Sequence, residues 1–134
     1  MELYIGGFAQ GKLEYVLAHV ADDNKYMIID CANDGYMEKI KEADTFNEKI
    51  LINHMHIWVK DLLKKGKEPY CEILSFAQKH TEAIFICDEI GSGIIPMEKE
   101  DRIWREETGR IVVDLAKKAE KVERILCGLG QRLK

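Results

Sequence analysis

A surplus of basic residues and long hydrophobic runs are both missing from this sequence. Its 134 residues hold 20 lysines and arginines against 24 aspartates and glutamates, which gives a net charge of −4. Proteins that bind nucleic acid normally carry a basic surplus, so we expect no nucleic-acid partner. No stretch approaches the roughly eighteen consecutive apolar residues of a membrane span. The start, Met1-Glu2, is acidic and leads straight into an apolar run, unlike a secretory signal.

Cysteines at the spacing of a metal or redox site are absent as well. The four cysteines, Cys31, Cys71, Cys87 and Cys127, are scattered along the chain. Three of them end apolar runs, where we expect small buried thiols. The length and the apolar content of 46% are typical of one soluble globular domain. We therefore predict a single domain over residues 1–134, in the reduced environment of the cytoplasm.

Apolar runs alternate with helical patterns along the chain. Two of the runs, in the segments YMIIDC and AIFICD, are almost continuously apolar, as in strands covered on both faces. This alternation predicts an α/β fold with a mostly parallel sheet of about four to five strands. The predicted strands are residues 3–5, 26–31, 83–87 and 122–127, and the predicted helices are residues 12–20, 47–65, 69–80 and 99–121.

Glycines and a lysine at the start of the chain have the spacing of a phosphate-binding loop. Gly6, Gly11 and Lys12 follow the first apolar run in the order Gly-x-x-x-x-Gly-Lys. Such glycines let successive backbone N–H groups turn toward phosphate oxygens, and the lysine adds a positive charge. A helix that begins after the loop points its positive end at the same anion. The predicted nucleotide-binding residues are Gly6, Gly7, Phe8, Ala9, Gln10, Gly11, Lys12 and Leu13.

The loop departs from its usual form at Leu13, because a serine or threonine that holds Mg²⁺ normally follows the lysine. Mg²⁺ would then depend on phosphate oxygens and on carboxylates at the carboxyl ends of neighbouring strands. Ligands of parallel α/β sheets bind at this edge, where residues 91–93 should also lie. The predicted catalytic residues are Lys12, Asp30 and Glu89, and the predicted metal ligands are Asp30 and Asp88.

Four histidines supply further candidates. His54 and His56 fall inside the predicted helix 47–65, where positions two apart do not share a face, so a joint zinc site is not expected. We expect one of them to face the nucleotide and the other to face solvent. His19 and His80 are interpreted as ordinary residues of helix surfaces.

The predicted helix 99–121 carries many charges and an internal glycine. Most of its charges are expected to form a solvated face, but Arg102, Arg105 or Arg110 could approach phosphates because the helix follows the loop at 91–96. Gly109 inside the helix predicts close packing at that point.

Several segments resemble the bifunctional adenosylcobinamide kinase/adenosylcobinamide-phosphate guanylyltransferases. Residues 87–96, CDEIGSGIIP, are similar to the family's Asn-Glu-Val-Gly-x-Gly-Ile-Val-Pro pattern, and a Gly109-Arg110 pair follows. The ending CGLGQRLK is similar to the family's Ser-Gly-Ile-Gly-x-x-x-Lys terminus, and GGFAQGKL resembles its Gly-Gly-x-x-x-Gly-Lys-Ser loop. The segment MIIDC resembles the family's Asp-Cys strand end. The resemblance is tightest over residues 87–134.

The resemblance implies a P-loop NTPase-like three-layer sandwich, a homo-oligomer and a transferase role in cobalamin biosynthesis. In that family GTP or ATP, with Mg²⁺, phosphorylates the aminopropanol hydroxyl of the corrinoid adenosylcobinamide. A histidine then carries GMP from GTP, and the corrinoid phosphate displaces it. By matching position, Gly6, Gly7, Gly11 and Lys12 are implied to bind phosphate, and Asp30 and Glu89 are implied to lie near the metal and the nucleotide.

The chain is shorter than members of this family usually are. The comparison predicts that the family's strand and helix with the guanylylated histidine have no counterpart between the first helix and MIIDC. We therefore expect kinase chemistry to be retained more readily than guanylyl transfer. Two alternatives stay open: a non-catalytic protein that binds a nucleotide or corrinoid, and a structural partner for another enzyme of the pathway.

Overall fold

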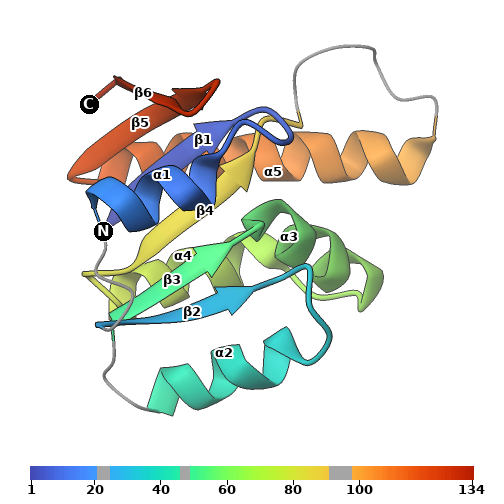
Figure 1. The fold of residues 1–134 in the computed structure, drawn as a ribbon. Coiled ribbons are helices and arrows are strands. Elements are labelled where there is room, and N and C mark those ends of the chain that lie inside the picture. Colours follow the sequence, from blue (N-terminus) through green and yellow to red (C-terminus); the bar gives the residue numbers. More distant parts are fainter. Residues whose placement is uncertain (21–24, 46–48, 91–97) are drawn as a thin grey trace.

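The computed structural model describes residues 1–20, 25–45, 49–90 and 98–134. Six strands and five helices lie within these ranges and are drawn in Figure 1. In chain order they are β1 (Glu2–Gly6), α1 (Lys12–His19), β2 (Tyr26–Asp30), α2 (Tyr36–Thr45), β3 (Lys49–Asn53), α3 (Met55–Lys64), α4 (Pro69–Lys79), β4 (Ile84–Asp88), α5 (Lys99–Lys118), β5 (Lys121–Leu126) and β6 (Leu129–Arg132).

The six strands form one sheet in the order β2-β3-β4-β1-β5-β6. The first five in that order are parallel, and β6 pairs antiparallel with β5. Helices cover both faces of the sheet, so the predicted α/β, P-loop NTPase-like three-layer fold is confirmed (Figure 1). The predicted count of about four to five strands is too low, because the sequence pattern does not anticipate β3 and β6.

The prediction of one helix over residues 47–65 is wrong in its first part. Strand β3 occupies Lys49–Asn53, between β2 and β4, and helix α3 begins only at Met55. Ile50, Leu51 and Ile52 are fully buried. A short continuous apolar run suits a central parallel strand, but periodicity alone cannot distinguish it from a turn of a buried helix.

The resemblance predicts that a strand and a helix are missing between the first helix and MIIDC. Within the described residues, α1 is followed by β2 with no helix or strand between them. Helix α2 and strand β3 come after β2, so the chain runs strand, helix, strand after α1. Helix α2 (Tyr36–Thr45) contains no histidine.

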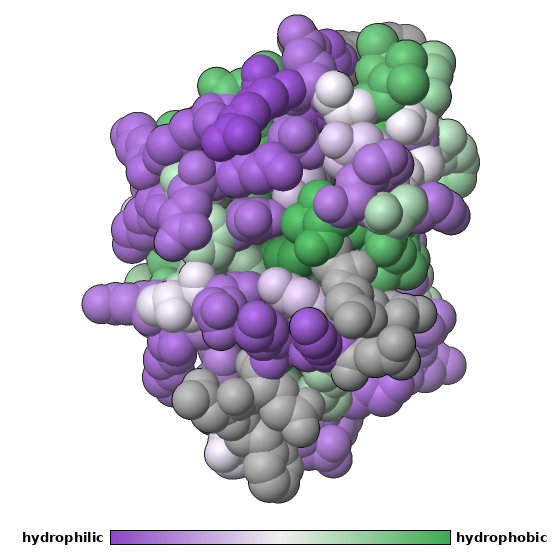
Figure 2. Space-filling view, turned by 60° about the vertical axis from the view of Figure 1, so that its left-hand side comes forward, coloured by the Kyte–Doolittle hydropathy of each residue, from purple (hydrophilic) through white to green (hydrophobic). Residues whose placement is uncertain are grey.

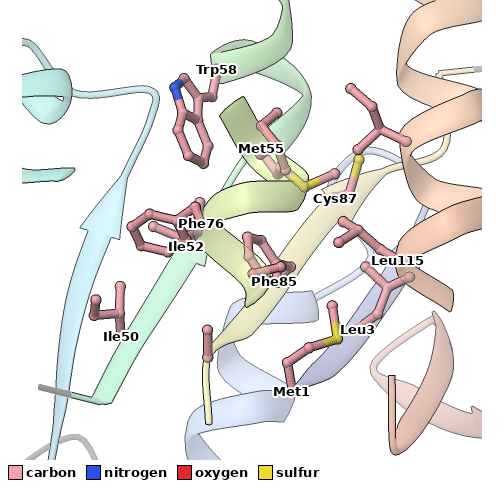
Figure 3. Close-up of a cluster of buried hydrophobic side chains, with 14 of the residues drawn as sticks. Met1, Leu3, Ile50, Ile52, Met55, Trp58, Phe76, Phe85, Cys87 and Leu115 are labelled. Carbon is pink, nitrogen blue, oxygen red and sulfur yellow. The ribbon is translucent and has the colours of Figure 1, made fainter. Parts of the chain in front are cut away.

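The core has two layers, one on each side of the sheet. On one face, α1 packs on a small cluster that includes Tyr4, Val16 and Ile86. On the other face, α2, α3, α4 and α5 cover a larger cluster, part of which is shown in Figure 3. In this cluster Trp58 and Phe76 meet edge to face, with ring centroids 5.6 Å apart. The two clusters fix the sheet whose carboxyl edge carries the polar residues described below.

The outer surface is polar over most of the face that Figure 2 shows, and hydrophobic residues form small groups between the hydrophilic ones. Within the described residues, no helix combines the length and apolarity that crossing a bilayer would need.

Two of the four cysteines are buried, and a prediction about the third is wrong. Cys31 and Cys87 are buried as expected, and burial raises the pKa of Cys87 to about 12. Cys127 is exposed, although it also follows an apolar run. Its φ of 52°, followed by φ 74° at Gly128, shows the reason: the two residues form the tight turn between β5 and β6.

Candidate functional site

The phosphate-loop residues form a tight connection between β1 and α1. Gly11 adopts φ 80° and Ala9 adopts φ 56°, both in the left-handed region. A Cβ atom at Gly6 would collide with the carbonyl oxygen of Ile125, so this glycine also allows β1 to approach β5 closely. Glycine is therefore required at position 6 for packing and at position 11 for conformation.

The β5–β6 turn holds the loop from the other side. The N–H of Cys127 donates to the side-chain oxygen of Gln10 over 2.7 Å, and the N–H of Gly128 donates to the Gln10 carbonyl over 2.9 Å. The side chain of Gln10 is thus occupied by the hairpin. Phe8, at the tip of the loop, is 83% exposed. The main chain of the loop, rather than these two side chains, is the part that could hold an anion.

Lys12 lies inside the site and pairs with a carboxylate. Its Nζ is 2.6 Å from Oδ1 of Asp88 and donates to the Gly7 carbonyl over 2.7 Å. The two side chains are only 7% and 11% exposed. The parallel register of β1 and β4 places Gly6 opposite Asp88 and so brings the loop and this carboxylate together.

His56 lies behind the same carboxylate. Its Nδ1 accepts the N–H of Asp88 over 3.2 Å, which places its own proton on Nε2, 3.5 Å from Oδ2 of Asp88. Burial lowers the pKa of His56 to about 4, against the opposing attraction of Asp88. The imidazole is therefore neutral at pH 7, and Lys12 remains the cation that balances Asp88.

Asp30 and His54 form a second pair, at the ends of β2 and β3. Nδ1–H of His54 donates to Oδ1 of Asp30 over 2.7 Å, while the side chain of Asn53 and the N–H of Ala32 also donate to the carboxylate. Burial opposes ionisation of Asp30, but these hydrogen bonds together have the larger effect and hold its pKa below the usual value. In the neutral ring the lone pair of His54 is then on Nε2, and no hydrogen bond to that atom is found among the described residues.

His54 adopts an unusual backbone conformation between β3 and α3. Its φ of 57° lies in the left-handed region, which costs energy for a residue with a side chain. Because it precedes the helix, the rule that positions two apart face different ways does not apply. The prediction that one of the two histidines faces solvent is wrong: His56 is buried against Asp88, and His54 is half-buried against Asp30.

One cavity brings these groups together. It has a volume of about 260 Å³ and contains the loop, both aspartates and one histidine. Asp30, Asp88 and Lys12 are all predicted site residues, and His54 is one of the two histidines of which one is expected to face the nucleotide. Asn53 is an addition from the structure. Its signal was the apolar run before it, which ends at Asn53 as the runs of β2 and β4 end at Asp30 and Asp88. The lining residues are Phe8, Ala9, Gln10, Gly11, Lys12, Leu13, Glu14, Asp30, Asn53, His54 and Asp88.

Glu89 is not part of this cavity wall. Both of its carboxylate oxygens accept from the guanidinium of Arg124, over 2.9 and 3.1 Å. Its N–H donates to the Gly6 carbonyl over 2.9 Å, so Glu89 fixes the end of β4 against β1. The loop predicted at residues 91–93 lies outside the described residues.

The carboxylates in the cavity suit a magnesium ion that also contacts phosphate. Mg²⁺ prefers oxygen ligands and commonly takes one or two carboxylates together with waters and substrate phosphates. Asp30 and Asp88 are donors of this type and would hold the ion, which would neutralise phosphate charge. Leu13 lines the same cavity and offers no ligand. Within the described ranges no cluster of three or more histidine, cysteine or acidic side chains could hold a metal without phosphate.

Three other sequence predictions are corrected by their surroundings. The guanidinium of Arg110 lies 4.5 Å from the centroid of the Tyr70 ring and pairs with Glu107, so it does not approach the loop. His80 is buried and its Nε2 is 3.0 Å from Asp44, although it looks like a surface residue in the sequence. Gly109 does not mark close packing within residues 1–20, 25–45, 49–90 and 98–134, since a Cβ there would meet none of their atoms within 4 Å.

The comparison with known proteins gives the family of the chain. Residues 8–133 match the model of a protein family described as cobinamide kinase / cobinamide phosphate guanyltransferase. No curated protein matches the sequence. The matched range contains Lys12, both aspartates of the cavity and His54. Since the match extends over nearly the whole chain, the protein belongs to the cobinamide kinase / cobinamide phosphate guanyltransferase family.

Proposed function

We propose that this protein is a kinase that uses GTP or ATP to phosphorylate the aminopropanol hydroxyl of adenosylcobinamide. Family membership implies a cobinamide kinase or guanyltransferase role in cobalamin biosynthesis. The observation that carries the kinase proposal is the cavity in which the phosphate loop, Lys12 and two aspartates meet. Phosphoryl transfer needs little more than a charged cradle and an oriented acceptor, and this set of residues supplies the cradle.

The proposed reaction is an in-line transfer of the γ-phosphoryl group. The acceptor oxygen forms a bond to the γ-phosphorus, the bond from that phosphorus to the β–γ bridging oxygen breaks, and the nucleoside diphosphate leaves. Lys12 would move from Asp88 to the phosphates, where its charge stabilises the transition state. The hydroxyl proton would pass to a carboxylate or phosphate oxygen in the cavity. Leu13 leaves Mg²⁺ dependent on the aspartates, as the donor set described above allows.

Incubation of the purified protein with nucleotide, Mg²⁺ and adenosylcobinamide tests the proposal. We expect phosphorylated corrinoid by mass spectrometry, and we expect Lys12→Ala to abolish it. Absence of product with nucleotide bound, measured by calorimetry, would instead support the non-catalytic binding protein. Absence of both product and nucleotide binding would support a structural partner.

A second activity, guanylyl transfer, is favoured by the Asp30–His54 pair. A covalent route needs a nucleophile near the α-phosphate. His54 offers one, because Asp30 holds the proton on Nδ1 and leaves Nε2 directed away from its carboxylate partner. Nε2 would form a bond to the α-phosphorus of GTP as pyrophosphate leaves. A corrinoid phosphate oxygen would then attack that phosphorus and break the bond to nitrogen.

Labelled GTP distinguishes this route from the kinase route. We expect protein-bound label from α-³²P GTP and none from γ-³²P GTP, with the label located on His54 by peptide mapping. The His54→Gln variant should lose the label, whereas His19→Gln, at an exposed site on α1, should retain it. An unlabelled protein that still phosphorylates corrinoid would remove His54 from the scheme and leave the kinase intact.

A further inference from the structure

A second cavity shares Asp88 with the first. It has a volume of about 360 Å³ and lies between the carboxyl ends of β1 and β4 and the middle of α5. Its wall is mainly apolar apart from two carboxylates and one hydroxyl. We call it the Thr108 cavity; it is lined by Ile5, Asp88, Glu89, Ile90, Thr108, Gly109 and Val112.

The hydroxyl of Thr108 is buried and has no hydrogen-bond partner among the residues that the structure describes. The residue is 2% exposed, and within these ranges its Oγ1 makes no hydrogen bond. A threonine in a helix normally satisfies this group by bonding to a backbone carbonyl one turn earlier. A buried hydroxyl that does not do so is unfavourable in the empty protein, and native structures rarely keep one without a reason.

Gly109 keeps this cavity open. The residue lies within helix α5, where glycine is less favourable than alanine. Neither a left-handed φ nor a close neighbour requires it, since a Cβ would meet no atom of the described part of the chain within 4 Å. A side chain at this position would instead take up space in the cavity that Gly109 lines.

We propose that the Thr108 cavity binds the short, hydroxyl-bearing aliphatic arm of the phosphoryl acceptor. Thr108 Oγ1 would hydrogen-bond to the acceptor hydroxyl, and Ile5 and Val112 would contact the hydrocarbon part. Asp88 lines both cavities, so the acceptor hydroxyl would meet the phosphates held by the loop and Lys12 beside this carboxylate. This assignment rests on the proposed kinase function for the identity of the acceptor, and it adds the place where the acceptor binds.

Filling the cavity tests the assignment in the enzyme assay. Gly109→Leu should raise the KM for adenosylcobinamide by about tenfold or more while the Kd for nucleotide changes less than about twofold. The matched control is Val113→Leu, which adds one methylene group to an exposed side chain of the same helix. An unchanged KM in Gly109→Leu, in a folded protein, would overturn the assignment even if the kinase reaction itself is found.

Removing the hydroxyl separates binding from structure. Thr108→Val keeps the shape of the side chain and deletes the unpartnered group, so Tm should stay the same or rise. The Kd for adenosylcobinamide should weaken by roughly three- to tenfold. Thr108→Ser retains the hydroxyl and should restore much of the affinity. A lower Tm in Thr108→Val with an unchanged Kd would show that the hydroxyl is structural, and the assignment would fall.

A probe that needs no turnover completes the test. Titration with 1-amino-2-propanol, followed by backbone amide NMR, should shift the signals of Thr108, Gly109 and Ile5, and 1-aminopropane should shift them less. Absence of shifts at these amides up to the solubility limit of the probe would overturn the assignment. If these shifts occur but no corrinoid is phosphorylated, the kinase proposal fails and the cavity assignment stands.

Discussion

Asp88 and Asp30 both end parallel strands at the same edge of the sheet and line the same cavity, yet their surroundings differ. Asp88 is 11% exposed and is paired with Lys12 at 2.6 Å, with a neutral histidine behind it. Asp30 is 24% exposed and is held by a histidine, an asparagine and a backbone N–H. The negative charge of Asp88 is thus balanced by a buried cation, whereas the negative charge of Asp30 is stabilised by hydrogen bonds.

The difference follows from the amount of water at each site. A buried carboxylate without a cation would be very unfavourable, so Asp88 needs Lys12 whenever no other cation is present. Asp30 is partly hydrated and is stable with three donors. We infer that the Lys12–Asp88 pair couples stability to nucleotide binding, because Lys12 cannot stay paired with the carboxylate when it binds phosphate. Asp30 orients His54, and it can exchange a hydrogen-bond partner for water at a lower cost in free energy.

Lys12→Met should have the largest effect, because it leaves the Asp88 carboxylate buried without its cation. We expect a loss of about 3–5 kcal/mol in the free energy of unfolding, measured with urea, and loss of nucleotide binding. The double variant Lys12→Met/Asp88→Asn should recover most of the stability but not the binding. Lys49→Met, which removes an exposed lysine 3.6 Å from Glu82, should cost less than about 0.5 kcal/mol. Equal losses in the two single variants would contradict the comparison.

The buried His56, next to Asp88, should make the free energy of unfolding depend on pH at mildly acidic pH. Its pKa is about 4 in the folded protein and about 6.5 in an unfolded chain, so only the unfolded chain binds the proton between these values. Stability should therefore fall as the pH drops from 6.5 to 4, by roughly 2–3 kcal/mol. The His56→Asn variant keeps an acceptor for the Asp88 N–H. Its free energy of unfolding should change less with pH over this range. A wild-type slope retained by His56→Asn would contradict this explanation.

Asp30→Asn should have a smaller effect on stability and a larger one on chemistry. The low pKa of Asp30 means that its carboxylate contributes stability above pH 4, which is lost as the pH falls through the folded value. At pH 7 we expect a cost of about 1 kcal/mol, because the remaining donors can reach water. Labelling of His54 by α-³²P GTP should drop by at least about tenfold, because the histidine loses the partner that fixes its tautomer. Labelling at the wild-type rate would show that Asp30 has only a structural role.

The phosphate loop and the two strand-end aspartates are predicted well by the sequence. The spacing Gly6–Lys12 identifies the loop, and the polar residue after each apolar run predicts Asp30 and Asp88 at one edge. Both predictions depend on local chemistry and on the rule that carboxyl ends of parallel strands share an edge. The family that the resemblance predicts is confirmed by the match over residues 8–133.

The surroundings of His54, Glu89 and Gly109 could not be predicted, because they depend on tertiary structure. Strand β3 has only three consecutive apolar residues, and His54 alone separates it from helix α3, so the period of this segment is ambiguous. The error placed His54 on a helical face that does not exist. Glu89 follows Asp88 in the chain, but only the packing of β5 against β1 shows that Arg124 occupies it. Gly109 signals space rather than contact, and composition cannot distinguish these two causes.

Leu13→Ser should have the smallest effect, and it sharpens the comparison by locating the metal. The added hydroxyl should strengthen nucleotide binding in Mg²⁺ by only a few-fold, about 1 kcal/mol or less, measured by calorimetry with and without the ion. When Lys12 moves to the phosphates, the buried Asp88 must gain another cation, whereas Asp30 keeps its three donors. The gain from Leu13→Ser should therefore survive in Asp30→Asn and disappear in Asp88→Asn. The reverse result would assign the metal to the wetter carboxylate and would mean that Asp88 serves Lys12 alone.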